Sequence, residues 1–222
     1  MKKILTLSRE LGSGGIHIAK NLAQRLNWKL IDKEVITEVA ELAQCPEDQI
    51  AKFDQEDFDR LKVLLNDLSF PVPGSGMMYP FMAGGYMEPY WLPSSVTDPL
   101  IIDESKYLKL TKTAIQNLAD KGNVVIVGRG SQVLLKDRQD TLHLRIVAPM
   151  EQRIARLMDV ANVDAAAAKQ LLIKRDKASA DYLQYFYQAQ WDNPQWYHLV
   201  LNTGMMSLQD AENLVYSCLN SM

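Results

Sequence analysis

The sequence is poor in the residues that build metal clusters and disulfide frameworks. It has two cysteines and three histidines in 222 residues, and Cys45 and Cys218 match no metal-ligand spacing. No run approaches the roughly 20 apolar residues that cross a bilayer, and no apolar leader opens the chain, so we expect a cytoplasmic protein without membrane contact. Positive charge is not in excess, because the formal net charge is -3, which disfavours nucleic acid as a partner.

What remains is a chain of ordinary globular composition with room for one domain. A chain of 222 residues buries roughly 70–75% of its unfolded surface. Short β-branched apolar runs alternate with longer helical patterns, which is typical of an α/β fold with a parallel sheet. The predicted strands cover residues 3–7, 29–31, 124–127, 142–147 and 199–202. The predicted helices cover residues 14–27, 33–43, 47–67, 103–121, 150–160, 164–188 and 207–220.

One stretch, residues 69–99, lacks the pattern of either element. It holds six of the nine prolines together with many aromatic and methionine side chains. A loop this long is uncommon in a compact domain, and disordered segments are poor in aromatic residues. Two interpretations follow: a surface loop pinned by its own apolar side chains, or a lid or aromatic wall for a flat ligand or a partner subunit. The aromatic candidates are Tyr79, Phe81, Tyr86, Tyr90 and Trp91.

A glycine cluster, LGSGG at residues 11–15, follows the first predicted strand and precedes the first helix. Such a loop binds phosphate because glycine allows positive φ, backbone N–H groups converge on the anion, and the helix dipole favours negative charge. The usual motif, G-x-x-x-x-G-K-[ST], also supplies a lysine and a hydroxyl. Here Gly15 stands at the lysine, Arg9 at the first glycine, and Ile16 and His17 near the hydroxyl position. The sequence therefore predicts the backbone cradle without its side-chain chemistry.

The same cluster also partly matches the dinucleotide-binding motif G-x-G-x-x-G, starting at Gly12. Asp32 ends the second predicted strand 20 residues later, where an acidic residue would meet a ribose. His17 stands at the third glycine, so this match is incomplete as well. A glycine-rich turn without any ligand is the third alternative, and the motif by itself leaves all three open.

Arginines follow at three later points of the chain. Arg129 stands between two glycines at the carboxyl end of an apolar strand, where α/β sheets bind their ligands. Arg153 and Arg156, three residues apart, share one face of a helix, and Arg175 lies in a later helix. Guanidinium groups suit bidentate phosphate binding, whereas a solvated charged face is the alternative for both helices.

The order of these features resembles the nucleoside monophosphate kinases of P-loop type, and within them the cytidylate-kinase-like proteins. The resemblance covers nearly the whole chain outside residues 45–102. Six segments carry it: RELGSGGIH for the phosphate loop, Asp32-Lys33 for the monophosphate site, VGRG, IVAPMEQRIARL, the lid segment RDKASADY, and LNTGMMSLQDA near the end. A divergent subfamily that begins SRELGSGG, and carries VIVGRG and NTG, also lacks the lysine, so its absence here resembles a group trait.

This resemblance implies one α/β domain with the three-layer fold of P-loop NTPases. It would have a five-stranded parallel sheet, a helical monophosphate-binding insertion at 45–102 and a helical lid-like segment at 161–192. The implied reaction moves the γ-phosphoryl group of ATP to a nucleoside monophosphate with Mg²⁺ as cofactor. The open alternatives are a nucleotide-binding sensor or interaction module without catalysis, a kinase with another acceptor, and an NAD-dependent oxidoreductase. Small-molecule nucleotides are the expected partners, and a homodimer through residues 69–99 is a further hypothesis.

The loop motif and the resemblance together assign roles to particular residues. Catalytic roles fall to Arg9, Arg175 and Arg153, with Arg9 or a lid arginine taking over the electrostatic role of the missing lysine. Nucleotide binding falls to Gly12, Ser13, Gly14, Gly15, Ile16, His17, Arg156, Asn202, Thr203 and Gly204. Acceptor binding falls to Asp32, Lys33, Arg129 and Asp176. No residue is assigned to the metal.

Overall fold

A parallel five-stranded sheet forms the centre of the protein. The computed structural model describes residues 2–32, 34–44, 46–51, 53 and 104–221. Its strands are β1 (Ile4–Arg9), β2 (Lys29–Ile31), β3 (Val124–Val127), β4 (Thr141–Val147) and β5 (Leu199–Asn202), in the order β2-β3-β1-β4-β5. The predicted α/β fold with five parallel strands is therefore confirmed.

The helices follow the predicted bounds closely except in the range 47–67, where the described helix ends at Ala51 and residues 54–67 lie outside the described residues. The helices are α1 (Gly15–Leu26), α2 (Glu34–Ala43), α3 (Glu47–Ala51), α5 (Glu104–Asp120), α6 (Ser131–Leu134), α7 (Met150–Ala161), α8 (Ala165–Tyr187) and α9 (Leu208–Ser221). The sequence did not predict α6 or the 3-10 turn Pro194–Trp196, because a single turn is too short to show helical periodicity. β1 runs two residues beyond its prediction, because Ser8 and Arg9 pair with Arg145 and Ile146 of β4.

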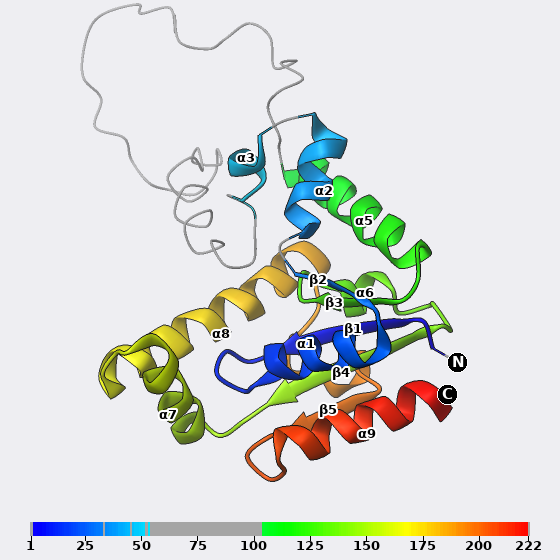
Figure 1. Cartoon of the computed structure of the whole chain (residues 1–222). Helices are drawn as coiled ribbons and strands as arrows, with labels where there is room; N and C mark the ends of the chain where they lie inside the picture. Colours follow the sequence, from blue (N-terminus) through cyan, green and yellow to red (C-terminus); the bar gives the residue numbers. More distant parts are fainter. Residues whose placement is uncertain (1, 33, 45, 52, 54–103, 222) are drawn as a thin grey trace, which may run out of the picture.

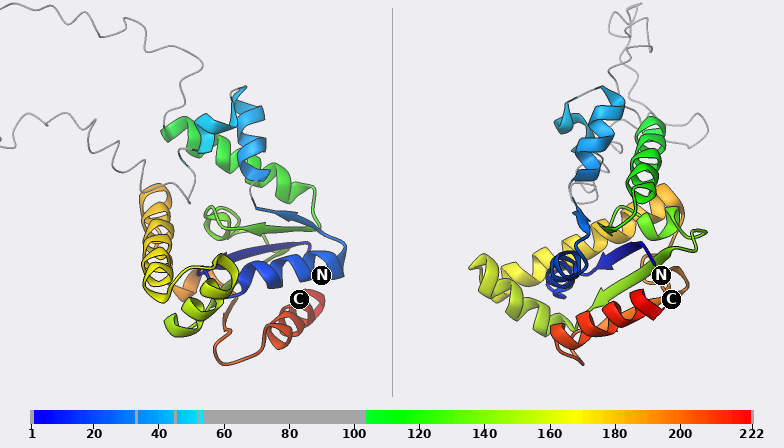
Figure 2. Two further views of the ribbon diagram at one scale, coloured as in Figure 1. Left: turned by 60° about the vertical axis from the view of Figure 1, so that its left-hand side comes forward. Right: turned by 45° about the vertical axis from the view of Figure 1, so that its right-hand side comes forward.

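Helices cover both faces of the sheet and give three layers, as Figures 1 and 2 show. Along β3, Val125 and Val127 point to one face and Val124 and Ile126 to the other, and all four are buried. The first face packs against α1 and α9, and the second against α2, α5 and the second half of α8. A continuous apolar run such as VVIV suits a strand buried on both faces.

The α7–α8 hairpin projects at the carboxyl end of the sheet, away from both chain termini (Figure 1). α7 ends at Asn162 in the left-handed conformation, and the Asp164 side chain caps α8 by accepting from the amide of Ala167 at 2.8 Å. Leu157 and Leu172 pack the two helices together in a small core of their own. α8 lies within the segment 161–192 that is predicted to be lid-like, whereas α7 precedes that segment and ends at its first residue.

A second group of helices, α2, α3 and α5, stands together beside the β2 edge (Figure 1). Phe53 stacks on Tyr107 of α5 with ring centroids 5.0 Å apart, so the described start of the predicted insertion packs on the core. The rest of the insertion at 45–102, the loop at 69–99 and the dimer contact predicted there lie outside the described residues. No described helix combines the length and apolar composition that a membrane crossing requires.

Candidate functional site

The phosphate loop lies between β1 and α1, and two of its glycines adopt conformations that other residues avoid. Gly12 has φ +77° and Gly14 has φ +81°, both in the left-handed region. A Cβ at Gly12 would also lie 2.9 Å from the carbonyl oxygen of Arg153. The glycines of LGSGG therefore let the backbone turn sharply against a neighbouring helix.

The carbonyl groups of this loop are all bound by donors from the protein. Four successive carbonyls, those of residues 10–13, accept hydrogen bonds from Ser13 Oγ (2.7 Å), Arg153 Nε (2.7 Å), Arg156 Nη1 (3.3 Å) and Thr203 Oγ1 (2.6 Å), in that order. The amides of Gly12, Gly14 and Ile16 form no hydrogen bond within the described part of the chain. Because the carbonyl oxygens of the loop are bound on one side of it, its N–H groups are available on the other side. Backbone N–H groups arranged in this way are typical of a backbone anion site.

Arg9 fills the space that a lysine at position 15 would need. A Cβ built on Gly15 would lie 2.8 Å from Arg9 Cβ and 3.3 Å from Arg9 Cδ, closer than side-chain atoms pack. Gly15 is not in the left-handed region, so neighbouring side chains and not the backbone exclude a larger residue there: Arg9 most closely, and Ile146, whose Cβ would lie 3.3 Å away. Arg9 Nε is buried and has no hydrogen-bond partner among the residues the structure describes. The absence of a side chain at position 15 thus goes together with the presence of the Arg9 side chain beside it.

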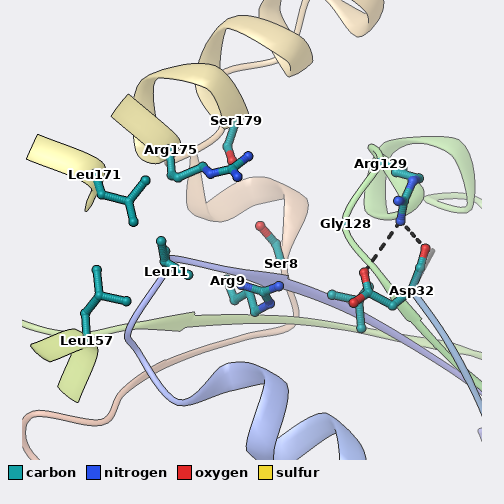
Figure 3. A pocket seen from close by; sticks show the side chains of 11 residues that line it. Ser8, Arg9, Leu11, Asp32, Gly128, Arg129, Leu157, Leu171, Arg175 and Ser179 are labelled. Atoms are coloured by element: carbon teal, nitrogen blue, oxygen red, sulfur yellow. Dashed lines mark hydrogen bonds and ion pairs between the residues drawn. The ribbon is translucent and has the colours of Figure 1, made fainter. Parts of the chain in front are cut away.

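A cavity of about 290 Å³ opens next to Arg9 at the carboxyl end of the sheet. Figure 3 shows Arg9 between an apolar group, Leu11, Leu157 and Leu171, and the pair of Asp32 with Arg129. Arg175 reaches in from α8 (Figure 3). The lining residues are Ser8, Arg9, Leu11, Asp32, Val127, Gly128, Arg129, Leu157, Leu171, Arg175 and Ser179. The cavity therefore brings together the predicted Arg9, Arg129, Arg175 and Asp32 from four separate parts of the chain.

Arg129 is held in an unusual backbone conformation. Its φ of +54° lies between those of Gly128, +72°, and Gly130, +69°, so three consecutive residues are left-handed. The guanidinium is buried, donates to the Asp32 carbonyl and lies 3.6 Å from Asp32 Oδ1. Tyr187 Oη donates to the Arg129 carbonyl at 3.1 Å, and burial raises the pKa of that phenol. A non-glycine residue with φ above zero costs of order 1 kcal/mol and points to a functional constraint.

Arg175 and Asp176 are neighbours on α8, but their side chains contact different groups. Arg175 lines the cavity, whereas the Asp176 carboxylate accepts from Arg153 Nη2 at 2.7 Å. Ser179, one helical turn after Arg175, lines the cavity with it. The Asp176–Arg153 contact therefore ties α8 to α7 and, through the carbonyl that Arg153 also binds, to the phosphate loop.

Arg153 is only 3% exposed and does not line the cavity. Besides Asp176 and the Leu11 carbonyl, it lies 3.4 Å from Glu10 Oε2 through Nη1. Glu10 Oε2 also accepts from the amide of Ala148 at 3.0 Å. All three nitrogens of this guanidinium thus face groups of the protein itself, in contrast with its predicted place at the reacting phosphates.

The other predicted nucleotide-binding residues lie around the outer side of the loop. Arg156 also donates to Thr203, at 3.0 Å to both the hydroxyl and the carbonyl, and Asn202 Oδ1 accepts from the Gly204 amide at 2.9 Å. Ile16 is half-buried and His17 exposed at the start of α1. The turn 202–204 therefore supports the loop through Thr203 and Arg156. Lys33 lies outside the described residues.

Several residues of the cavity wall were not found from the sequence. Ser179 shares a helix face with Arg175 four residues earlier, so helical spacing carried a usable signal. Ser8 directly precedes Arg9, but nothing in the sequence distinguishes it from a core position of the strand. The leucines, Leu11, Leu157 and Leu171, look like any other apolar residues of their helices and loop. No three histidine, cysteine or acidic side chains gather as a metal site among the described residues.

The pattern of the cytidylate kinase-like family matches residues 4–205, a range that contains every site residue discussed above. The chain is 28% identical over 107 residues, 47% of its length, to cytidylate kinase of Methanocaldococcus jannaschii, and covers 60% of that protein. It is 29% identical over 105 residues to uronate isomerase of Corynebacterium glutamicum, covering 47% of this chain and 20% of that protein.

A solved structure resembles the chain over its full length. The crystal structure of an uncharacterized protein from Eubacterium ventriosum superposes with a TM-score of 0.67 at 19% identity, covering 100% of both chains. This likeness concerns the fold. The chain spans less than two thirds of the two curated relatives it matches.

Proposed function

The chain belongs to the cytidylate kinase-like family, and we propose that it is a phosphotransferase that moves the γ-phosphoryl group of ATP to a nucleoside monophosphate. One observation carries the proposal: Arg9, Arg129 and Arg175 line one cavity beside a loop in which the amides of Gly12, Gly14 and Ile16 form no hydrogen bond within the described residues. Guanidinium groups and backbone amides are the donors that bind phosphate oxygens.

The ATP phosphates would lie on the loop. The amides of Gly12, Gly14 and Ile16 offer donors, and α1 adds the positive end of its dipole. The partnerless Nε of Arg9 is a buried donor at the same place, and such a donor is stabilised when an anion supplies the acceptor. Ser13, Gly15 and His17 complete the loop segment, while Arg156 and Thr203 of the turn 202–204 would support it from behind by holding the carbonyls of Gly12 and Ser13.

The transfer itself needs positioning and positive charge more than covalent help. An acceptor oxygen forms a bond to the γ-phosphorus while the bond from that phosphorus to the β–γ bridging oxygen breaks, which leaves ADP. Charge spreads over the transferring oxygens, and fixed cations stabilise it. We assign this task to Arg9, in place of the missing lysine, and to Arg175, which approaches from the lid.

Arg129 and Asp32 would form the acceptor side of the cavity. The Asp32 contact holds the guanidinium of Arg129 toward the cavity, where it can bind the phosphate of the acceptor. Lys33 and the insertion at 45–102 would add contacts to the base, as in the kinases that the sequence resembles. Asp176 is assigned here to the lid contact with Arg153, and we assign Arg153 a positioning role for the loop and lid.

Mg²⁺ prefers oxygen ligands and is usually held by one or two carboxylates together with the phosphates of the substrate. Among the described lining residues the carboxylate is that of Asp32, and the hydroxyls are those of Ser8 and Ser179. These groups fit such an ion. When bound, it neutralises charge on the phosphate oxygens.

The test is ADP release from Mg-ATP with CMP, dCMP and UMP as acceptors, run beside calorimetric binding of ATP and NAD. Turnover with one monophosphate supports the proposal. Binding of ATP without turnover would favour the alternative of a nucleotide-binding module without catalysis. The missing lysine is the observation that supports this alternative. Binding of NAD alone would contradict the proposal and favour the dinucleotide alternative.

A further inference from the structure

The peptide between Arg129 and Gly130 is held by a side chain to which neither the sequence nor the proposed function gives a role. Tyr187, the last residue of α8, donates from its hydroxyl to the Arg129 carbonyl at 3.1 Å. Its ring lies directly against Gly130, because a Cβ built there would be 2.3 Å from Tyr187 Cε2 and 2.8 Å from Tyr187 Cζ. One side chain therefore contacts this peptide twice, at its carbonyl through the hydroxyl and at the following Cα through the ring.

The backbone at this contact adopts a conformation that needs support. Residues 128–130 have φ of +72°, +54° and +69°, and the middle one, Arg129, carries a large side chain. Left-handed backbone is unfavourable for such a residue and persists where the surrounding structure holds it. At position 130 the ring of Tyr187 leaves no room for any side chain, so glycine is required there for space as well as for its φ. The ring and hydroxyl of Tyr187 are part of the structure that holds this turn.

The Tyr187 hydroxyl is held in turn by two further tyrosines. Tyr182 makes a hydrogen bond to it, and Tyr182 Oη lies 3.2 Å from Tyr107 Oη of α5. A phenol has one proton to donate, and that of Tyr187 goes to the Arg129 carbonyl. Tyr182 is therefore the donor to Tyr187, and Tyr107 is the donor to Tyr182. Burial raises the pKa of the Tyr187 phenol, so it remains a donor at neutral pH.

This chain of hydroxyls begins beside the predicted insertion. Phe53 stacks on Tyr107 with ring centroids 5.0 Å apart and an angle of 19° between the rings. Tyr107 and Tyr182 are at most 2% exposed, so their hydrogen bond lies in the interior, where it is stronger than in water. The described start of the insertion is thereby connected, through α5 and α8, to the peptide that follows Arg129.

We infer that Tyr187 is a positioning residue for Arg129, which fixes the 129–130 peptide and thereby the placement of the guanidinium. That guanidinium is buried, lines the cavity and lies 3.6 Å from Asp32 Oδ1. Backbone angles decide which rotamers a side chain can adopt, so a change in this peptide would displace the guanidinium from Asp32. The inference rests on the proposed function only for what Arg129 binds, the phosphate of the acceptor.

The first test needs no nucleotide. It compares, by NMR of the full chain, the carbonyl carbon-13 signal of Arg129 and its Nε–H signal, the latter identified by its absence from Arg129→Asn. Tyr187→Phe removes the hydroxyl and keeps the ring on Gly130, whereas Tyr185→Phe removes a hydroxyl from a side chain that is 49% exposed on the same helix. We expect both Arg129 signals to move in Tyr187→Phe and neither in Tyr185→Phe. Movement of the carbonyl signal alone, or of neither signal, in Tyr187→Phe would overturn the inference.

The second test is a double-variant cycle with CMP as the probe. Tyr187→Phe is expected to weaken the calorimetric affinity for CMP by about three- to tenfold and to raise the KM for CMP by the same factor, with kcat changed by less than about twofold. In the Arg129→Asn background it should have no further effect, because the group that it positions is gone. An equal loss in both backgrounds would mean a general structural role and would overturn the inference. A wild type that binds no CMP would contradict the proposed acceptor, and the NMR comparison would still decide the role of Tyr187.

Discussion

Two groups of arginines surround the phosphate loop, and they differ in what their guanidinium groups contact. Behind the loop, Arg153 and Arg156 donate to the carbonyls of Leu11 and Gly12. In front of it, Arg9, Arg129 and Arg175 line the cavity. The first group turns the loop carbonyls away from the cavity, and this leaves the amides for a ligand. On the proposed function, arginines would have two separate tasks, and their place relative to the loop would decide which one each performs.

The largest expected effect comes from removing the most deeply engaged arginine. Arg153→Ala would leave Glu10 and Asp176 without their buried partner, and breaking a buried ion pair costs about 3–5 kcal/mol. We expect a drop of that size in the unfolding free energy, measured by urea denaturation. Lys112→Ala, an exposed cation on α5, should change it by less than about 1 kcal/mol. Unchanged stability together with lost turnover would place Arg153 among the catalytic residues instead.

Arg175 should give the opposite signature. Because it faces the cavity from the lid, Arg175→Ala is expected to lower kcat by about 10²–10³-fold with little change in the KM for ATP. Lys174→Ala, on an exposed neighbour in the same helix, serves as the control and should retain kcat. A drop in stability comparable to that of Arg153→Ala would move Arg175 into the structural group.

Arg129 should affect the acceptor more than the chemistry. Arg129→Asn is expected to raise the KM for the monophosphate about tenfold, as one charge-assisted contact is lost. Asparagine tolerates the left-handed backbone, and the chain uses it at φ of 53°, 53° and 52° at positions 27, 123 and 162. Arg129→Gly, which removes all side-chain strain, should give the same KM. A difference between the two variants would mean that the backbone, and not the guanidinium, causes the effect.

The fold was predictable where the signal is local. The run VVIV gave the bounds of β3, and the periodicity of residues 103–121 gave α5 to within a residue at each end. One-turn elements such as α6 have no period to detect. The predicted insertion at 45–102 stays a prediction beyond its described start.

The candidate site was predictable as a set of residue types and less so as an arrangement. The glycines, Asp32 and the arginines all stood out in the sequence. Spacing alone could not show that Arg153 binds Asp176, 23 residues later in the chain, and does not line the cavity. The exclusion of a side chain at Gly15 by Arg9 is likewise a packing contact across the loop. Both depend on the path of the backbone, which no motif encodes.

The central claim is that Arg9 replaces the missing lysine, and a swap of the two positions tests it most directly. Mg-ATP-dependent phosphoryl transfer would be measured for the wild type, Arg9→Gln, Gly15→Lys and the double variant Arg9→Gly/Gly15→Lys. We predict that Arg9→Gln falls by about 10²–10³-fold, that Gly15→Lys fails because its side chain meets Arg9, and that the double variant recovers at least about tenfold over Arg9→Gln. Wild-type turnover by Arg9→Gln would contradict the account.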